Sequence, residues 1–112
     1  MAEPTLTAGR ALNRDDAGYE TARRDTVWRT NMPDRFPECI VQANSVGDVV
    51  AAVRAAKAEG RQVGVRSGGH SWSANHVRDG GVLIDVSRLK AFTVDKSAMT
   101  ATAEPGLGGS VL

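Results

Sequence analysis

The sequence has a single cysteine and almost no excess of one charge, and each shortage excludes a class of protein. Cys39 has no partner for a disulfide within the chain, so the fold does not require an oxidising compartment. The 14 Lys and Arg residues are balanced by 13 Asp and Glu residues, which gives a net charge of +1. This balance predicts no affinity for nucleic acid or anionic membrane, because both require a concentrated basic surface.

Long apolar runs, a targeting segment and metal-ligand clusters are also absent from the sequence. No stretch approaches the roughly 18–20 apolar residues of a transmembrane helix, and the N-terminus lacks the basic start and apolar run of a secretory signal. We therefore expect a cytoplasmic location. His76 has no partner at metal-ligand spacing, so no metal site is predicted, and we expect His76 to be a solvated loop residue.

The chain has 112 residues, of which 41% are hydrophobic, and this is typical of one soluble globular domain or part of one. Residues 1–18 are polar without sustained periodicity and are expected to form a flexible leader, followed by the ordered part at 19–112. The chain stops just after a glycine-rich turn, where Val111 and Leu112 would begin a helix. Since domains seldom end in such a turn, we expect a truncation at the C-terminus.

Hydrophobic patterning predicts a strand–helix–strand unit in the middle of the chain. Cys39–Ala43 and Gln62–Arg66 are typical of short strands. Between them, Ser45 followed by Asp48 resembles a capping box, and apolar residues at helical spacing lead to a glycine stop at Gly60. If the two strands pair in parallel, the crossover is expected to be right-handed.

Further elements are predicted on both sides of this unit: a short helix at 16–28, a loop at 67–81, and strands at 82–86, 92–94 and 99–103. The predicted order is therefore β-α-β-β-β-β after the first helix. This order indicates an α+β fold, in which the β-α-β unit is followed by mainly antiparallel strands.

The segment Arg66–Ser73 has the composition of a ligand-binding loop. It begins where a predicted strand ends, which is where open α/β sheets bind ligands. The adjacent Gly68 and Gly69 let a ligand approach the main chain, and successive N–H groups in such a turn suit a diphosphate. Taken alone, the two glycines are equally typical of an ordinary surface loop.

Two commoner nucleotide loops do not fit the sequence. A Walker loop ends in Gly-Lys-Ser/Thr, which is absent here. The second glycine cluster, which starts at Gly106, has Val111 where the dinucleotide fingerprint needs its third glycine.

Several motifs in order carry a resemblance to one family. Val65–Ser71 follows the strand–helix–strand unit, Asp79–Leu89 comes next, and a glycine turn lies at 105–109. Together they strongly resemble the PCMH-type FAD-binding domain shared by vanillyl-alcohol oxidase, p-cresol methylhydroxylase and the berberine bridge enzyme-like oxidases. The resemblance covers residues 19–112.

The resemblance implies that the first loop wraps the FAD diphosphate and that His70 bonds covalently to the 8α-methyl of the flavin ring. It implies a cofactor-binding set of Arg66, Ser67, Gly68, Gly69, His70, Ser71, Trp72, Pro105, Gly106, Gly108 and Gly109. The implied activity is oxidation of a small organic substrate by hydride transfer to flavin N5, with molecular oxygen as the expected acceptor. Substrate-binding residues and a catalytic base would lie in later domains, so the 112 residues alone are expected to be inactive.

Alternatives remain at the level of single residues and of the whole chain. His70 could contact FAD without a covalent bond, Trp72 could pack by the cofactor or only cover the loop, and Cys39 is interpreted as a buried hydrophobe. Asp79 and Asp85 are interpreted as structural rather than as a catalytic carboxylate pair. The chain could also be a non-catalytic or degenerate flavin-domain fragment, or part of a non-covalent FAD reductase of the same fold.

Overall fold

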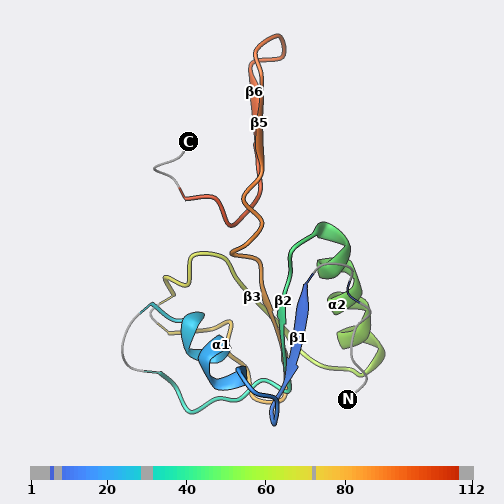
Figure 1. The fold of residues 1–112 in the computed structure, drawn as a ribbon, viewed down its shortest axis with the longest axis vertical. Coiled ribbons are helices and arrows are strands. Elements are labelled where there is room, and N and C mark those ends of the chain that lie inside the picture. The colour runs from blue at the N-terminus through green and yellow to red at the C-terminus, as the bar shows by residue number, and fades with distance from the viewer. Residues whose placement is uncertain (1–5, 7–8, 29–31, 72, 109–112) are drawn as a thin grey trace.

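The computed structural model describes residues 6, 9–28, 32–71 and 73–108, which form two helices and six strands (Figure 1). The elements in chain order are β1 (Arg10–Asn13), α1 (Tyr19–Asp25), β2 (Cys39–Gln42), α2 (Val46–Ala58), β3 (Val63–Arg66), β4 (Val82–Asp85), β5 (Phe92–Asp95) and β6 (Thr100–Ala103). The predicted α+β class is confirmed.

Four of the strands form one sheet in the order β1-β2-β4-β3. Strand β4 lies between β2 and β3 and pairs with both in parallel, so these two strands do not pair with each other. Of the strands after β3, β5 and β6 pair antiparallel as expected, whereas β4 joins the sheet in parallel. Val82, Leu83 and Ile84 are apolar and buried, as in the centre of a parallel sheet, and the long loop after β3 supplies the crossover.

The two helices cover opposite faces of this sheet, which gives three layers (Figure 1). Alternate residues of each strand point to opposite faces. The side chains of Ile40 and Leu83 pack with Tyr19 and Ala22 of α1. The core on the other face contains residues of β2 and β4 and two alanines of α2: Cys39, Val41, Val82, Ile84, Ala52 and Ala56.

The start and end of α2 follow the signals in the sequence. The backbone N–H of Asp48 donates to Oγ of Ser45 at 3.1 Å, and the Asp48 carboxylate accepts from the N–H of Asn44 at 3.1 Å. The helix ends before Gly60, whose φ of +66° is open to glycine at little cost. The predicted boundaries of this helix are confirmed.

The structure corrects the expected leader. Arg10–Asn13, within residues 1–18, forms β1 and pairs antiparallel with β2 through the register pair Leu12–Ile40. Leu12 is the only buried residue of this strand. One buried side chain in four residues does not make a periodic hydrophobic pattern, so the sequence did not indicate a strand here. Helix α1 is also shorter than the predicted 16–28, because Gly18 has a φ of +88° at its start.

Strands β5 and β6 form a separate antiparallel hairpin, as the sequence predicts for this pair. All of their residues are exposed. Figure 1 shows the hairpin projecting from the edge of the sheet where β2, β3 and β4 end.

Candidate functional site

The carboxyl ends of the parallel strands gather the two segments that the sequence predicts as the site. Strand β3 ends at Arg66 and leads into the glycine loop, while β4 ends at Asp85 and leads into the turn at 86–89. The second glycine turn packs against that turn, since the N–H of Gly106 donates to the carbonyl of Leu89 at 2.8 Å. Ligands bind at this edge in open α/β sheets.

An ion pair joins the ends of β3 and β4. Nη1 of Arg66 lies 3.1 and 3.2 Å from the two carboxylate oxygens of Asp85, and Nη1 of Arg88 lies 3.9 Å from the same carboxylate. The carboxylate also accepts from the N–H of Ser87 at 3.0 Å. Asp85 is thus structural, as predicted from its place at a strand end, but its pairing with Arg66 was not foreseen.

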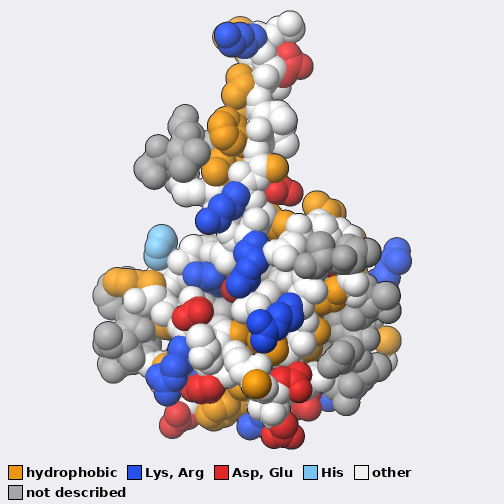
Figure 2. Space-filling model, in the orientation of Figure 1, with side chains coloured by type: hydrophobic (Ala, Val, Ile, Leu, Met, Phe, Trp, Pro, Cys, Tyr) orange, Lys and Arg blue, Asp and Glu red, His pale blue; other side chains and the backbone are white. Residues whose placement is uncertain are grey.

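The charges around Asp85 do not cancel, because two guanidinium groups face one carboxylate. Figure 2 shows Lys and Arg side chains gathered where the hairpin meets the body of the molecule. Nε of Arg66 is buried and has no hydrogen-bond partner among the described residues. The edge therefore carries a local positive excess and an unused buried donor, both of which suit an anionic group.

The backbone hydrogen bonds of the glycine loop are made by its carbonyl groups. The carbonyls of Arg66, Gly69 and Ser71 accept hydrogen bonds from other backbone N–H groups. In the part of the chain that the structure describes, the four consecutive N–H groups of Ser67–His70 have no partner. Consecutive free amides at a strand end form a concave site for a phosphate oxygen.

Gly69 fixes the shape of this loop. Its φ is +72°, and a Cβ at this position would lie 2.6 Å from the carbonyl oxygen of Thr26. The N–H of Trp28 donates to the carbonyl of Gly69 at 3.1 Å. The Trp28 and His70 rings meet edge to face, with centroids 6.3 Å apart at 82°. The segment after α1 therefore supports the loop, a contact that the sequence did not reveal because the two segments are far apart in the chain.

The two histidines of the loop differ in environment. His70 is exposed, whereas His76 is buried beside the small apolar cluster of Val27, Ala74 and Val77, which corrects the expectation of a solvated residue. The loop folds tightly onto β3 here, since a Cβ on Gly64 would overlap the His76 carbonyl oxygen. Burial lowers the pKa of His76, and a hydrogen bond with the Thr26 backbone opposes this in part.

The second glycine turn can pack against the turn at 86–89 only because Gly106 has no side chain. A Cβ on Gly106 would meet the carbonyl oxygen of Ser87 and lie 2.7 Å from that of Leu89. Pro105 and Gly108 flank this contact and are exposed. Trp72 and Gly109, the remaining members of the predicted set, lie outside the described residues.

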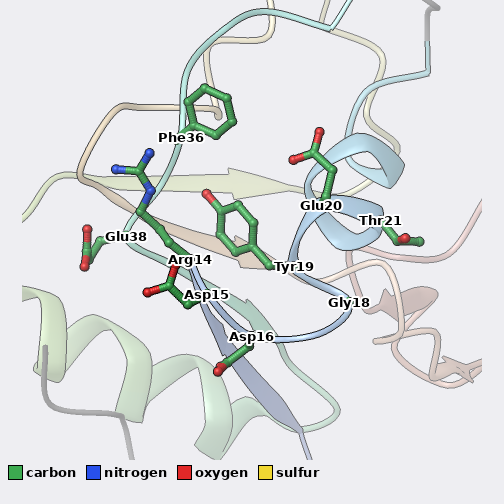
Figure 3. Close-up of a pocket in the computed structure, with 9 residues that line it drawn as sticks. All are labelled: Arg14, Asp15, Asp16, Gly18, Tyr19, Glu20, Thr21, Phe36 and Glu38. Carbon is green, nitrogen blue, oxygen red and sulfur yellow. The ribbon is translucent and has the colours of Figure 1, made fainter.

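A hollow of about 630 Å³ lies away from both glycine segments, at the start of α1 (Figure 3). Its lining side chains come from the turn after β1, from α1 and from the segment before β2: Arg14, Asp15, Asp16, Tyr19, Glu20, Thr21, Phe36 and Glu38, together with Gly18. Burial raises the pKa of Tyr19 to about 12, and its hydroxyl donates to the Pro37 carbonyl at 2.5 Å. The acidic lining disfavours a diphosphate.

The remaining candidates have structural positions. Cys39 is fully buried in the core against α2, and the carboxylate of Asp79 accepts from the N–H of Phe36 at 2.6 Å. Among the described residues, no group of three His, Cys, Asp or Glu side chains is placed to hold a metal ion. Neither of the described helices has the length and apolar character to span a membrane.

Comparison with known proteins gives one consistent result. The family model described as FAD binding domain matches residues 37–112. The chain is 30% identical over its full length to (R)-6-hydroxynicotine oxidase of Paenarthrobacter nicotinovorans, covering 23% of that protein. It is 38% identical over 84% of its length to the FAD-linked oxidoreductase nodO of Hypoxylon pulicicidum, covering 21% of that relative.

Solved structures agree with these matches. The crystal structure of 6-hydroxy-D-nicotine oxidase from Arthrobacter nicotinovorans superposes with a TM-score of 0.79 at 28% identity, over 96% of this chain and 23% of that one. The BBE-like 1 structure of Physcomitrella patens gives a TM-score of 0.71 at 31% identity, over 86% of this chain and 21% of that one. The chain thus spans about a fifth of the length of these relatives. It belongs to the PCMH-type FAD-binding domain family of FAD-linked oxidoreductases.

Proposed function

We propose that the edge formed by the two glycine segments binds the diphosphate of FAD and presents the flavin ring to His70. The observation that carries this proposal is the row of four N–H groups at Ser67–His70 with no partner among the described residues, beside the positive excess around Asp85. The proposed binding set within the described residues is Arg66, Ser67, Gly68, Gly69, His70, Ser71, Pro105, Gly106 and Gly108. Trp72 and Gly109 belong to the same proposal through the family resemblance alone.

The charges at this edge favour a diphosphate over an uncharged group. Phosphate oxygens accept strong hydrogen bonds from consecutive backbone amides and from guanidinium groups. Arg66 supplies its unpartnered Nε, and Arg88 is half exposed and remains free to turn towards an anion. The absence of a side chain on Gly69 lets the loop pack against the Thr26 carbonyl, and its positive φ sets the turn in which the N–H groups follow one another.

We also propose that His70 forms a covalent bond to the 8α-carbon of FAD. The bond would join an imidazole nitrogen to the 8α-carbon with loss of the imidazole N–H hydrogen and one 8α hydrogen, and molecular oxygen would take up these two hydrogens with their electrons as hydrogen peroxide. His70 is exposed and lies at the end of the proposed diphosphate loop, which supports its role as the attached residue.

Bound FAD would supply two-electron redox chemistry, with a small organic substrate as the hydride donor to N5 and oxygen as the proposed acceptor. The relatives named 6-hydroxynicotine oxidase and xylooligosaccharide oxidase support this class of reaction. In this proposal the chain's own residues bind and fix the cofactor. Binding of the substrate and removal of its proton fall to residues outside the chain.

The test compares His70→Ala with Ser73→Ala in the protein at its natural length, produced in the presence of FAD. Ser73 is an exposed residue of the same loop and is the matched control. Total flavin is measured by absorbance of the native protein, and covalent flavin by fluorescence of acid-precipitated protein. We expect covalent flavin in the wild type and in Ser73→Ala, and bound but acid-released flavin in His70→Ala.

A second measurement tests binding of the diphosphate and adenosine part of FAD. The His70→Ala apoprotein is titrated with FAD and with riboflavin, which lacks the diphosphate. We expect FAD to bind at least about a hundredfold more tightly, which corresponds to about 2.7 kcal/mol of contacts to the diphosphate and adenosine. Equal affinities would contradict the proposed diphosphate edge, and a wild type free of flavin in both assays would contradict FAD binding by this protein.

A further inference from the structure

We propose that Trp28 is a positioning residue for His70, one that holds the imidazole in the orientation needed for its attachment to FAD. The inference rests on the covalent role proposed for His70. Trp28 follows α1 and belongs to neither of the two glycine segments.

The main chain of the Trp28 segment fixes the backbone just before His70. The N–H of Trp28 donates to the Gly69 carbonyl at 3.1 Å, and the Thr26 carbonyl lies where a side chain on Gly69 would stand. Gly69 keeps its φ of +72° between these two contacts. The backbone direction at His70 is therefore set by residues 26–28.

The segment is itself firmly held. The hydroxyl of Thr26 donates to the Arg23 carbonyl at 2.7 Å, and the N–H of Val27 donates to that of Arg24 at 3.1 Å, so the segment continues from the end of α1. Val27 is buried with Ala74 and Val77, residues of the same loop that carries His70. Trp28 is thus attached to the body of the domain on one side and to the loop on the other.

The imidazole of His70 has two neighbours, the Trp28 ring and the backbone of Gly68. The Trp28 and His70 rings meet edge to face at 82°. A Cβ on Gly68 would lie 3.1 Å from Cε1 and 3.2 Å from Nδ1 of His70, so the ring also lies close to the loop backbone. These two neighbours restrict the rotation of an exposed side chain that would otherwise sample several rotamers.

Restricted rotation matters because the new bond needs the nitrogen lone pair to point at one carbon atom. Holding reacting groups in line raises the rate of bond formation, and misplacement by an ångström can lower it by about a hundredfold. Trp28 is half exposed, so it adds little to the core. Its loss should therefore slow attachment more than it weakens the fold.

The experiment follows flavin attachment over time in the apoprotein at its natural length after FAD is added. Trp28→Leu keeps an apolar side chain but removes the aromatic ring, whereas Trp28→Phe keeps an aromatic ring. Val53→Ala on α2 is the control, because Val53 is an exposed apolar residue on the helix that covers the other face of the sheet. Total bound flavin and acid-stable flavin are measured on the same samples.

We expect Trp28→Leu to bind the wild-type amount of flavin and to attach it at least about tenfold more slowly. Trp28→Phe should recover most of the rate, and Val53→Ala should match the wild type. Wild-type attachment kinetics in Trp28→Leu would overturn the inference and leave the role of His70 intact. Loss of bound flavin in Trp28→Leu at an unchanged attachment rate would also overturn it, since Trp28 would then serve binding alone.

The failure of the underlying proposal has a different signature. If the wild type binds flavin but releases all of it in acid, His70 is not an attachment residue. Trp28 then cannot act by positioning His70 for attachment. That result is visible in the wild type before any Trp28 variant is examined.

Discussion

Arg66 and Asp85 face each other across the last register pair of β3 and β4, with Nη1 of Arg66 3.1 and 3.2 Å from the two carboxylate oxygens. Their side chains are only 17% and 3% exposed, so solvent screens the pair weakly. The pair ties the strand that leads into the glycine loop to the strand that leads into the turn under Gly106.

The Asp85→Asn substitution should therefore destabilise the fold. The amide would keep an acceptor for the N–H of Ser87 but would leave the Arg66 guanidinium without its counter-charge. Removing one partner of a largely buried pair costs about 3 kcal/mol, and this loss can be measured by urea unfolding followed by tryptophan fluorescence. Asp25→Asn, at an exposed position on α1, is the control and should change stability by less than about 0.5 kcal/mol. An equal effect of both variants would show that the pair contributes nothing.

Substitution by alanine should have different effects at Gly69 and at Gly60. Both have a positive φ, +72° and +66°, but a Cβ on Gly69 would lie 2.6 Å from the Thr26 carbonyl, whereas a Cβ on Gly60 would meet nothing within 4 Å. Gly60→Ala should cost about 1 kcal/mol, the price of the left-handed conformation alone. Gly69→Ala should cost clearly more and should reduce flavin bound at a fixed FAD concentration. Thermal unfolding and flavin absorbance test both outcomes, and similar losses in the two variants would argue against a tight contact with Thr26.

Gly106 and Gly47 should respond differently to substitution by alanine. A Cβ on Gly106 would overlap the Ser87 carbonyl oxygen, so Gly106→Ala should destabilise the protein by about 2 kcal/mol, a typical cost of overpacking. A Cβ on Gly47, in the first turn of α2, would meet only Oγ of Ser45 at 3.7 Å. Gly47→Ala should be neutral or should stabilise the helix by up to about 1 kcal/mol. The free energies of unfolding of both variants check the two predictions.

The burial of His76 predicts a pH dependence of stability. Because its pKa is lowered in the folded state, the unfolded chain binds the proton more readily. The free energy of unfolding should therefore fall as the pH drops below about 6.5, and the loss should be complete below the folded-state pKa. In His76→Gln this part of the pH dependence should disappear. Parallel stability profiles for wild type and variant would contradict the prediction, since the two proteins share all other titratable groups.

The sequence predicts best what local signals control. Ser45 and Gly60 mark the ends of α2, and a short apolar run marks β2, so the strand–helix–strand unit could be placed closely. The two glycine segments could be identified as site candidates for the same reason, since their composition alone is unusual. The position of the first segment at an edge of the sheet followed from the end of β3, whereas the second is placed by the contact of Gly106 with Leu89.

Contacts between distant segments could not be predicted in this way. The central place of β4 and the pairing of β1 depend on which strands meet in space, and no single residue encodes that. The edge contact of Trp28 with His70 and the burial of His76 also arise from folding of the loop onto other elements. The polar composition of the loop indicates exposure, and His76 departs from it because its part of the loop folds tightly onto Gly64 of β3.

The place of β4 in the sheet also constrains how the domain is made. A ribosome releases β2, α2 and β3 first, and at that stage the two strands flank a gap with no partner for either inner edge. The sheet closes only when Val82–Asp85 emerges, and the segment that delivers these residues is the glycine loop itself. The four-stranded sheet is thus completed only after the glycine loop has been synthesised, and a nascent chain stalled within that loop would present two open strand edges to its neighbours.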